Sequence, residues 1–346
     1  MRVLVGMSGG IDSTYAALKL MEEGHTVEGA VLIMHEYTEL DAAKEAAESI
    51  GIPLHTVDCR KEFEAAVIPN FIEEYQNART PNPCIICNSD VKFKVLCEYA
   101  EANGFDKIAT GHYADIVKID SDKGVRYALK RAKDAKKDQT YMLWRLTQLE
   151  LRSLVLPLAG LTKEEIRIAA EARDLTAANR KDSQEICFIP SGEYAEFIEE
   201  RVGPSAEGDF VDEEGNPLGK HKGIIRYTVG QRKGLGIALG SRAFITDIDP
   251  ATARITVSLE NKPKSEFYVS NLVFSGIEPP TDGEIRELSV KVRYQAPLTK
   301  ATVTFDGEDG AKVVLSEPKS AIAKGQSAVF FDGDMLACGG FIMDVK

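Results

Sequence analysis

The stretch Gly6-Met7-Ser8-Gly9-Gly10-Ile11-Asp12-Ser13 decides the fold. An apolar run suited to a buried parallel strand, residues 3–5, precedes it, and apolar residues at helical spacing follow it at Ile11, Tyr15, Leu18 and Met21. Glycines at such a junction let the backbone turn tightly and approach an anion, and the free N–H groups of the helix start point at phosphate. The stretch lacks the Gly-Lys-Ser/Thr ending of the ordinary P-loop. It predicts a phosphate-binding turn, against the simpler alternative of a glycine turn with a Ser/Asp cap.

The same alternation of strand and helix continues through the first half of the chain. Strands are expected at residues 27–33, 54–57 and 107–110, and helices at 41–49, 63–75, 91–102 and 162–174. Thr162 and Glu165 form a capping-box pattern at the start of the last of these helices. Residues 116–119 and 125–129 flank a polar turn and predict a hairpin at the edge of the sheet. The pattern predicts an α/β domain with a doubly wound parallel sheet.

The sequence pattern changes after Gly203-Pro204, where expected strands and glycine-rich turns replace expected helices. From Glu266 onward, short apolar segments separated by Gly/Asp turns are typical of a small antiparallel β-barrel. We therefore expect three domains: residues 1–203, a β-rich central domain at 204–265, and a C-terminal barrel at 266–346.

Composition limits the class of protein. The 346 residues are 44% hydrophobic and 28% charged, as in a globular chain, and no apolar run reaches the roughly 20 residues that span a bilayer. The first residues lack a secretory signal, so a cytoplasmic protein without a membrane partner is expected. The net charge of −12 disfavours nucleic-acid binding overall, but basic residues cluster within 123–137 and 220–233. Either cluster alone is most simply a solvated surface.

Two further segments contain cysteines that suggest chemistry. Thr80-Pro81-Asn82-Pro83-Cys84-Ile85-Ile86-Cys87-Asn88 precedes the expected helix at 91–102, and a cysteine at a helix amino terminus tends to have a lowered pKa. Cys87 is therefore a candidate reactive thiol. The Cys-x-x-Cys spacing also suits half a zinc site, but no second pair completes it. Cys187, between Ile186 and Phe188, would by itself be read as core filler.

Taken together, these segments resemble a known family. Ser-Gly-Gly-x-Asp-Ser is similar to the PP-loop of N-type ATP pyrophosphatases. The order of a PP-loop, a Pro-Asn-Pro-x-x-x-Cys segment and residues 182–188, Asp-Ser-x-x-Ile-Cys-Phe, resembles the tRNA-specific 2-thiouridylases. Further matches extend almost to the carboxyl terminus, including residues 109–113, 137–141, 230–236 and 325–329. The resemblance implies sulfur transfer to C2 of the wobble uridine after its oxygen is adenylated, with AMP and pyrophosphate as products.

The resemblance also assigns residues. It implies that Asp12 is catalytic and that ATP and Mg²⁺ are held by Gly6, Met7, Ser8, Gly9, Gly10, Ile11, Asp12 and Ser13, with Leu32 and Gly111 on the adenine side. It implies that Asn82, Pro83 and Cys84 cradle the flipped base, which must leave the stack before chemistry. The implied tRNA contacts are His112, Lys137, Asp138, Gln139, Arg293, Tyr294 and Gln326.

The route of the sulfur has two readings. In the family's usual scheme Cys187 carries a persulfide and Cys87 resolves it. Many members have Asp where this chain has Cys84, and three cysteines, Cys84, Cys87 and Cys187, resemble the set that holds a 4Fe-4S cluster in related tRNA thiolation enzymes. We favour the cluster as a hypothesis and keep the persulfide pair as its alternative. The resemblance leaves open whether the sulfur donor is a cysteine desulfurase, a relay protein or free sulfide.

Two alternatives to this function remain at the level of sequence. A different PP-loop enzyme, such as an amidotransferase-type synthetase or a thiolase acting at another tRNA position, would keep ATP cleavage to AMP and change the substrate. A non-catalytic RNA-binding or iron–sulfur carrier protein would keep the barrel and the cysteines, but the intact residues 8–13 argue against it.

Overall fold

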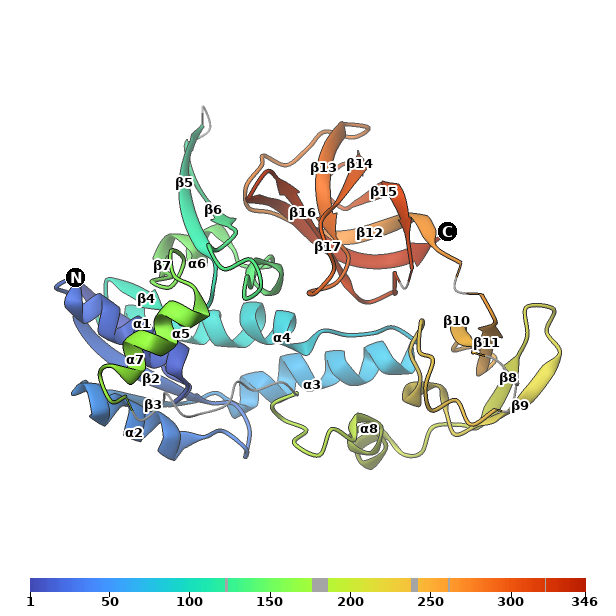
Figure 1. The fold of residues 1–346 in the computed structure, drawn as a ribbon, viewed down its shortest axis with the longest axis horizontal. Coiled ribbons are helices and arrows are strands. Elements are labelled where there is room, and N and C mark those ends of the chain that lie inside the picture. The colour runs from blue at the N-terminus through green and yellow to red at the C-terminus, as the bar shows by residue number, and fades with distance from the viewer. Residues whose placement is uncertain (122–123, 176–185, 238–241, 261, 321) are drawn as a thin grey trace.

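The computed structural model describes residues 1–121, 124–175, 186–237, 242–260, 262–320 and 322–346 (Figure 1). Its first part is a five-stranded parallel sheet in the order β3-β2-β1-β4-β7. The strands are β1 (Arg2–Gly6), β2 (Thr26–Ile33), β3 (Leu54–Asp58), β4 (Lys107–Ala109) and β7 (Leu154–Val155). The helices around it include α1 (Ile11–Glu22), α2 (Leu40–Ile50), α3 (Arg60–Gln76), α6 (Gln148–Ser153) and α7 (Lys163–Glu171).

Alternate residues of β1 face two different cores. Val3 and Val5 pack with Leu20 of α1 and Ala43 of α2, whereas Leu4 belongs to the larger core that contains α3. Helices therefore cover both faces of the sheet, which confirms the doubly wound α/β prediction. The Thr162–Glu165 capping box at the start of α7 is present as expected.

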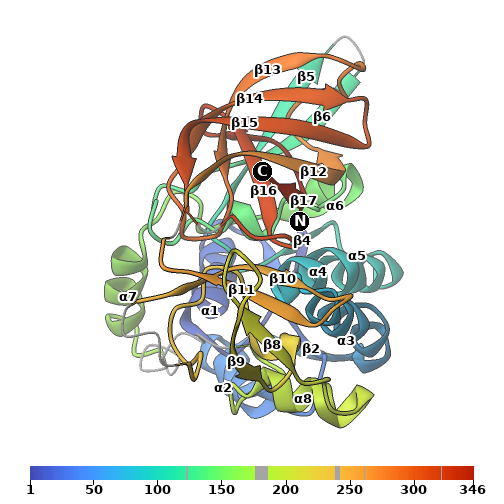
Figure 2. The ribbon, with the colours of Figure 1, turned by 90° about the vertical axis from the view of Figure 1, so that its right-hand side faces the viewer.

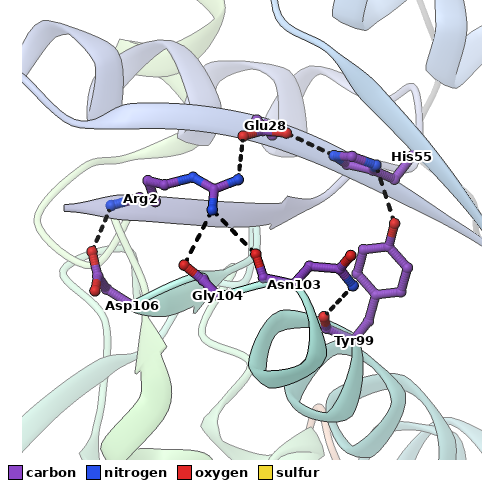
Figure 3. Close-up of polar contacts among 7 residues, drawn as sticks. All are labelled: Arg2, Glu28, His55, Tyr99, Asn103, Gly104 and Asp106. Atoms are coloured by element: carbon purple, nitrogen blue, oxygen red, sulfur yellow. Dashed lines mark hydrogen bonds and ion pairs between the residues drawn. The ribbon is translucent and has the colours of Figure 1, made fainter.

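A polar network fixes the helix that follows the cysteine segment to this sheet (Figure 3). Glu28 on β2 accepts hydrogen bonds from Arg2 (2.9 Å) and contacts His55 Nε2 (2.7 Å), and these two interactions lower its pKa. His55 Nδ1 lies 3.1 Å from the hydroxyl of Tyr99. Arg2 also bonds, through its guanidinium or its backbone N–H, groups that precede β4: the carbonyls of Asn103 and Gly104 and the carboxylate of Asp106. Strands β1, β2 and β3 are thus tied to one helix.

That helix begins earlier than the sequence predicted. It runs as α4 (Pro83–Ile86), a π-helical turn η1 (Cys87–Lys92) and α5 (Phe93–Ala102). The expected start at residue 91 is wrong because Pro83 occupies the first helical position after an extended Asn82, where its missing N–H costs nothing. Ser89, which precedes the expected start, is internal to this helix and donates its hydroxyl to the carbonyl of Ile85.

The predicted hairpin is present, but it does not join the parallel sheet. β5 (Asp115–Ser121) and β6 (Gly124–Lys130) pair with each other, and Lys130 of β6 pairs with Met335 of β17 (Met335–Val345). Arg126 donates to the carbonyl of Phe274 (2.7 Å) and so adds a second link to the barrel. Sequence alternation could identify the hairpin but not its distant partner.

The rest of the chain forms two β structures, as expected (Figures 1 and 2). After α8 (Tyr194–Val202), β8 (Gly208–Val211), β9 (Pro217–His221), β10 (Phe244–Asp249) and β11 (Arg254–Ser258) form a sheet in the order β10-β11-β8-β9. Six antiparallel strands then close into a barrel through β12–β17 pairing: β12 (Lys264–Phe274), β13 (Ile285–Lys291), β14 (Thr299–Asp306), β15 (Gly310–Lys319), β16 (Ser327–Asp332) and β17 (Met335–Val345). The C-terminal barrel prediction is confirmed.

Short 3₁₀ turns, η2 (Thr140–Met142) and η4 (Ile224–Arg226), lie in the connections, and η4 contacts α3. Among the described residues, no helix has the length and apolar character needed to span a bilayer.

Candidate active site

The glycine-rich turn lies between β1 and α1, as the sequence predicted. Gly9 has φ +77°, and a Cβ there would lie 2.6 Å from the backbone of Ala42, so only glycine fits. The hydroxyl of Ser13 donates to the carbonyl of Gly10 (3.0 Å) and lies 3.2 Å from the hydroxyl of Ser8. The N-cap of α1, Gly10, has no side chain to cap the helix. The first-turn N–H groups are therefore available to an anion.

A second turn closes against the first. A Cβ at Gly111 would lie 2.6 Å from the backbone of Asp12 and Ser13, so the segment after β4 packs directly on the start of α1. β1 has β2 on one side and β4 on the other, which makes this edge the switch point where ligands of such sheets bind. Leu32, near the end of β2, and Gly111 thus lie at the same carboxyl edge as the turn.

Asp12 is held by two residues that the sequence analysis missed. Tyr113 donates its hydroxyl to one carboxylate oxygen (2.6 Å), and the ammonium of Lys163 donates to the other (2.7 Å). Lys163 is only 7% exposed, and its backbone N–H donates to Asp134 (3.0 Å). No local signal pointed to it, because Lys163 lies 151 residues from Asp12 and occupies an ordinary first helical turn.

These residues fit a magnesium–triphosphate group. The uncapped start of α1 offers N–H donors, the position of Gly9 leaves room for close approach of the backbone, and Asp12 supplies the carboxylate oxygen that Mg²⁺ prefers. Lys163 adds a buried positive charge beside that carboxylate.

The cysteine prediction needs a correction. Cys87 lies beyond the first turn of its helix and is buried, with its thiol donating to the sulfur of Met34 (3.5 Å). Burial raises the pKa of Cys87 to about 12, so the lowered pKa expected from a helix amino terminus is wrong. Cys84 instead occupies the first turn, and it is exposed.

Cys187 is exposed rather than core filler. Desolvation by the surrounding protein nevertheless raises the pKa of both Cys84 and Cys187, a combination typical of thiols in a concave part of a surface. The three thiols interact electrostatically with one another, and the ammonium of Lys92 opposes the rise in pKa at each of them. The structure thus brings the three predicted cysteines into one region.

That region does not fit a cluster as it stands. Within the residues for which positions are given, no three His, Cys, Asp or Glu side chains are grouped so that they could hold a metal ion. The thiol of Cys87 is directed at Met34 instead. Residues 181–185 of the motif that precedes Cys187 lie outside the described residues.

One predicted tRNA contact lies on a barrel loop that supports the segment before two predicted base contacts, although the two segments are far apart in sequence. The side-chain amide of Gln326 donates to the carbonyl of Thr80 (2.8 Å), and the N–H of Thr80 donates to the carbonyl of Lys324 (2.8 Å). A barrel loop therefore supports the segment that leads to Asn82 and Pro83. Asn82 itself donates to the sulfur of Met142 (3.4 Å).

Other predicted tRNA contacts have internal partners. His112 lies 2.8 Å from the hydroxyl of Thr110, and burial lowers its pKa to about 3, so its ring is neutral at physiological pH. Asp138 is 2% exposed and accepts the N–H of Ala132. Gln139 accepts the N–H of Tyr113 (2.9 Å). Asp138 and Gln139 therefore order the loop that carries Lys137, which is half-buried.

The last two predicted contacts lie beyond the end of β13. Arg293 is exposed, and the ring of Tyr294 lies 6.2 Å from that of Tyr141.

Comparison with known proteins covers nearly the whole chain. Residues 1–191 match a family described as the tRNA methyl transferase HUP domain, 195–259 its PRC-barrel domain, and 264–342 an aminomethyltransferase beta-barrel domain. The chain is 42% identical to the tRNA-specific 2-thiouridylase MnmA of Clostridium acetobutylicum, over 99% of each chain. It is 41% identical to the protein of that name from Treponema denticola, over 100% of this chain and 99% of the other.

Proposed function

Since this chain belongs to the family of tRNA-specific 2-thiouridylases, we propose that it forms 2-thiouridine at the wobble position of tRNA and cleaves ATP to AMP and pyrophosphate. One observation carries the proposal: the phosphate-binding turn, the end of β2 and the cysteine helix meet at one edge of the sheet, where Met34 contacts Cys87. This arrangement would place the bound nucleotide and the transferred sulfur atom next to the same uridine.

In the activation step, the uridine O2 attacks the α-phosphate and pyrophosphate leaves. The N–H groups at the start of α1 would bind the departing pyrophosphate, which needs positive charge. Magnesium, when bound with ATP, neutralises phosphate charge. Asp12 would orient that ion, and Lys163 holds the carboxylate of Asp12 in place.

In the sulfur-transfer step, we assign the exposed Cys187 as the residue that receives sulfur as a persulfide. The terminal sulfur attacks C2, and AMP leaves with the former O2. The thiolate of Cys87 then attacks Sγ of Cys187, which frees the sulfur to the product and leaves a Cys87–Cys187 disulfide for an external reductant. Cys87 is buried, so a sulfur donor on another molecule would not reach it, and it would act as the resolving thiol. Because burial raises its pKa to about 12, its proton must leave as the thiol attacks.

The substrate would be bound across all three domains, 1–203, 204–265 and 266–346. Asn82, Pro83 and Cys84 would cradle the flipped uridine, and the implied tRNA contacts named above would bind its backbone or neighbouring bases. The donor of sulfur to Cys187 would be a desulfurase or a relay protein that itself carries a persulfide. Free sulfide would serve only by attacking the adenylated C2 directly, with AMP as the leaving group. The reaction would take place in the cytoplasm.

The test of the function combines two measurements. Protein, ATP, Mg²⁺, unmodified tRNA and a sulfur donor protein that carries a persulfide should yield AMP and pyrophosphate, and mass spectrometry of the digested tRNA should find 2-thiouridine at the wobble position. ADP and phosphate as products would refute the PP-loop assignment. Sulfur at another nucleotide would support the alternative of a thiolase with a different target.

The 4Fe-4S hypothesis is tested separately through Cys84, because the described residues do not provide a cluster site. Cys84→Asp restores the residue common in the family and removes one of the three thiols. With a persulfide pair it should keep thiolation within a few-fold, and anaerobically purified protein should contain little iron. About four irons per chain, lost together with activity in Cys84→Asp, would establish the cluster instead.

A further inference from the structure

A cavity of about 580 Å³ lies where the three parts of the chain meet, away from the phosphate-binding turn. This volume is within the range of small-ligand sites. Its lining comes from α3, α8, η4 with the turn after it, and the segment after β13: Tyr75, Tyr194, Arg226, Thr228, Val229, Gly230, Gln231 and Arg293. Only Arg293 among these belongs to the predicted site, and the basic cluster at residues 220–233 has no role so far.

The cavity is lined by two positively charged guanidinium groups. The guanidinium of Arg226 forms an ion pair with Glu199 through Nη2, but its Nε is buried without a hydrogen-bond partner among the described residues. Arg293 adds a second guanidinium at the exposed side. Two such forks suit a phosphate group.

The cavity lining also contains two aromatic side chains, those of Tyr75 and Tyr194. The rings of Tyr75 and Tyr194 are stacked at 4.6 Å with an interplanar angle of 23°. Tyr75 continues into a series of ring contacts through Phe71 to Phe188, at 5.1 and 5.4 Å, and Phe188 directly follows Cys187. The cavity is therefore linked by packed rings to the segment that carries the proposed sulfur acceptor.

We propose that this junction cavity binds one nucleotide of single-stranded RNA, with its phosphate on Arg226 and Arg293 and its base against Tyr194. Bases of RNA loops are bound in this way, splayed out and stacked on aromatic rings while arginines hold the backbone. The inference rests on the proposed function, which makes that nucleotide a neighbour of the target uridine in the anticodon loop. In a chain of net charge −12, such local pairs of arginines supply the attraction.

The first experiment measures binding of a fluorescent anticodon stem-loop RNA by anisotropy at several salt concentrations. Arg226→Gln and Tyr194→Leu should each weaken binding about 10-fold, and Arg226→Gln should lower the salt slope by about 1. Arg226→Gln combined with Glu199→Gln should bind as weakly, which excludes an effect of the unpaired carboxylate. Arg254→Gln, on β11 of the same domain and outside the cavity, is the matched control and should bind like wild type.

The second experiment identifies the nucleotide. Stem-loops that lack one base at a time next to the target uridine are titrated against wild type and Tyr194→Leu. At the bound position, loss of the base should weaken wild-type binding and abolish the difference between the two proteins. ATP binding and thermal melting report that each variant is folded.

The experiments distinguish failure of the cavity proposal from failure of the proposed function. If wild type binds and thiolates the stem-loop while Arg226→Gln and Tyr194→Leu bind it as tightly as wild type does, the cavity is not a nucleotide site. If binding of free AMP but not of RNA responds to the variants, the cavity is a site for a free nucleotide and the inference is overturned. If wild type neither binds nor thiolates the RNA, the proposed function itself fails.

Discussion

The nucleotide turn and the cysteine region differ in how their geometry arises. The turn is one contiguous stretch, and its shape is set by the positive φ of Gly9 and by hydroxyls within the same eight residues. The cysteine region combines a helix start with a distant segment, and tertiary burial, not position on a helix, sets the pKa of Cys87. Local sequence therefore fixes the first region, whereas packing fixes the second.

The largest expected effect separates the two regions chemically. Cys187→Ser removes the proposed sulfur acceptor, so thiolation with a protein sulfur donor should fall by at least about 10⁴-fold. AMP and pyrophosphate should still form, because the nucleotide turn is untouched. The measurements are 2-thiouridine by mass spectrometry and AMP by chromatography.

The matched control for this variant is Cys97→Ser, since Cys97 packs against the core with α5 and has no proposed role. It should keep both activities within a few-fold. Loss of AMP formation in Cys187→Ser would mean that adenylation depends on the cysteine region and that the two regions do not act separately.

The second prediction concerns the nucleotide turn. Asp12→Asn leaves the shape of the side chain but removes the charge that faces Lys163, so AMP formation should fall by about 10³-fold. Binding of the stem-loop RNA should be unchanged. Asp41→Asn, at an exposed carboxylate on α2, should leave both quantities unchanged. AMP formation near the wild-type rate in Asp12→Asn would remove Asp12 from the site.

The sequence predicts features that depend on neighbouring residues and misses features that depend on contacts between distant segments. The turn, the alternation of strands and helices, and the barrel could be anticipated because each depends on a local pattern. Lys163 could not, since only the fold brings α7 to α1. The start of the cysteine helix was missed although a signal was present: Asn82-Pro83 is a favoured start, because the first helical position does not need the N–H that proline lacks.

The π-helical turn also could not be predicted from the sequence. η1 inserts the wider turn at Cys87–Lys92, and the N–H of Phe93 bonds the carbonyl of Asn88. The side-chain amide of Asn88 bonds the carbonyl of Met142 (3.0 Å). Such turns are frequent at functional sites, but no residue pattern predicts them.

The third prediction tests the missed residue. Lys163→Met should lower kcat/KM for ATP about 30-fold, because a charged hydrogen bond contributes about 2 kcal/mol. If Lys163 acts by positioning Asp12, Lys163→Arg should recover part of kcat, which general destabilisation would not allow. Lys133→Met, which removes an exposed lysine paired with Glu165 near the same helix start, is the control and should have little effect. Equal losses in Lys163→Met and Lys133→Met would show that only the stability of α7 is involved.

The smallest effect concerns His112. The resemblance implies that His112 contacts tRNA, and the pKa of its buried ring decides whether that contact carries a positive charge. Burial lowers its pKa in the folded protein from 6.5 to about 3, so between these pH values the unfolded chain binds one more proton at this residue. Stability must therefore decrease as pH falls below 6.5, by about 2 kcal/mol between pH 7 and pH 5 from this group. His112→Gln removes the group, so urea unfolding of the variant should lose about 2 kcal/mol less than wild type over that interval. Equal losses in the two proteins would mean that the folded protein also protonates His112, as a cationic contact to a tRNA phosphate would require; the expected difference instead restricts His112 to hydrogen bonding as a neutral ring.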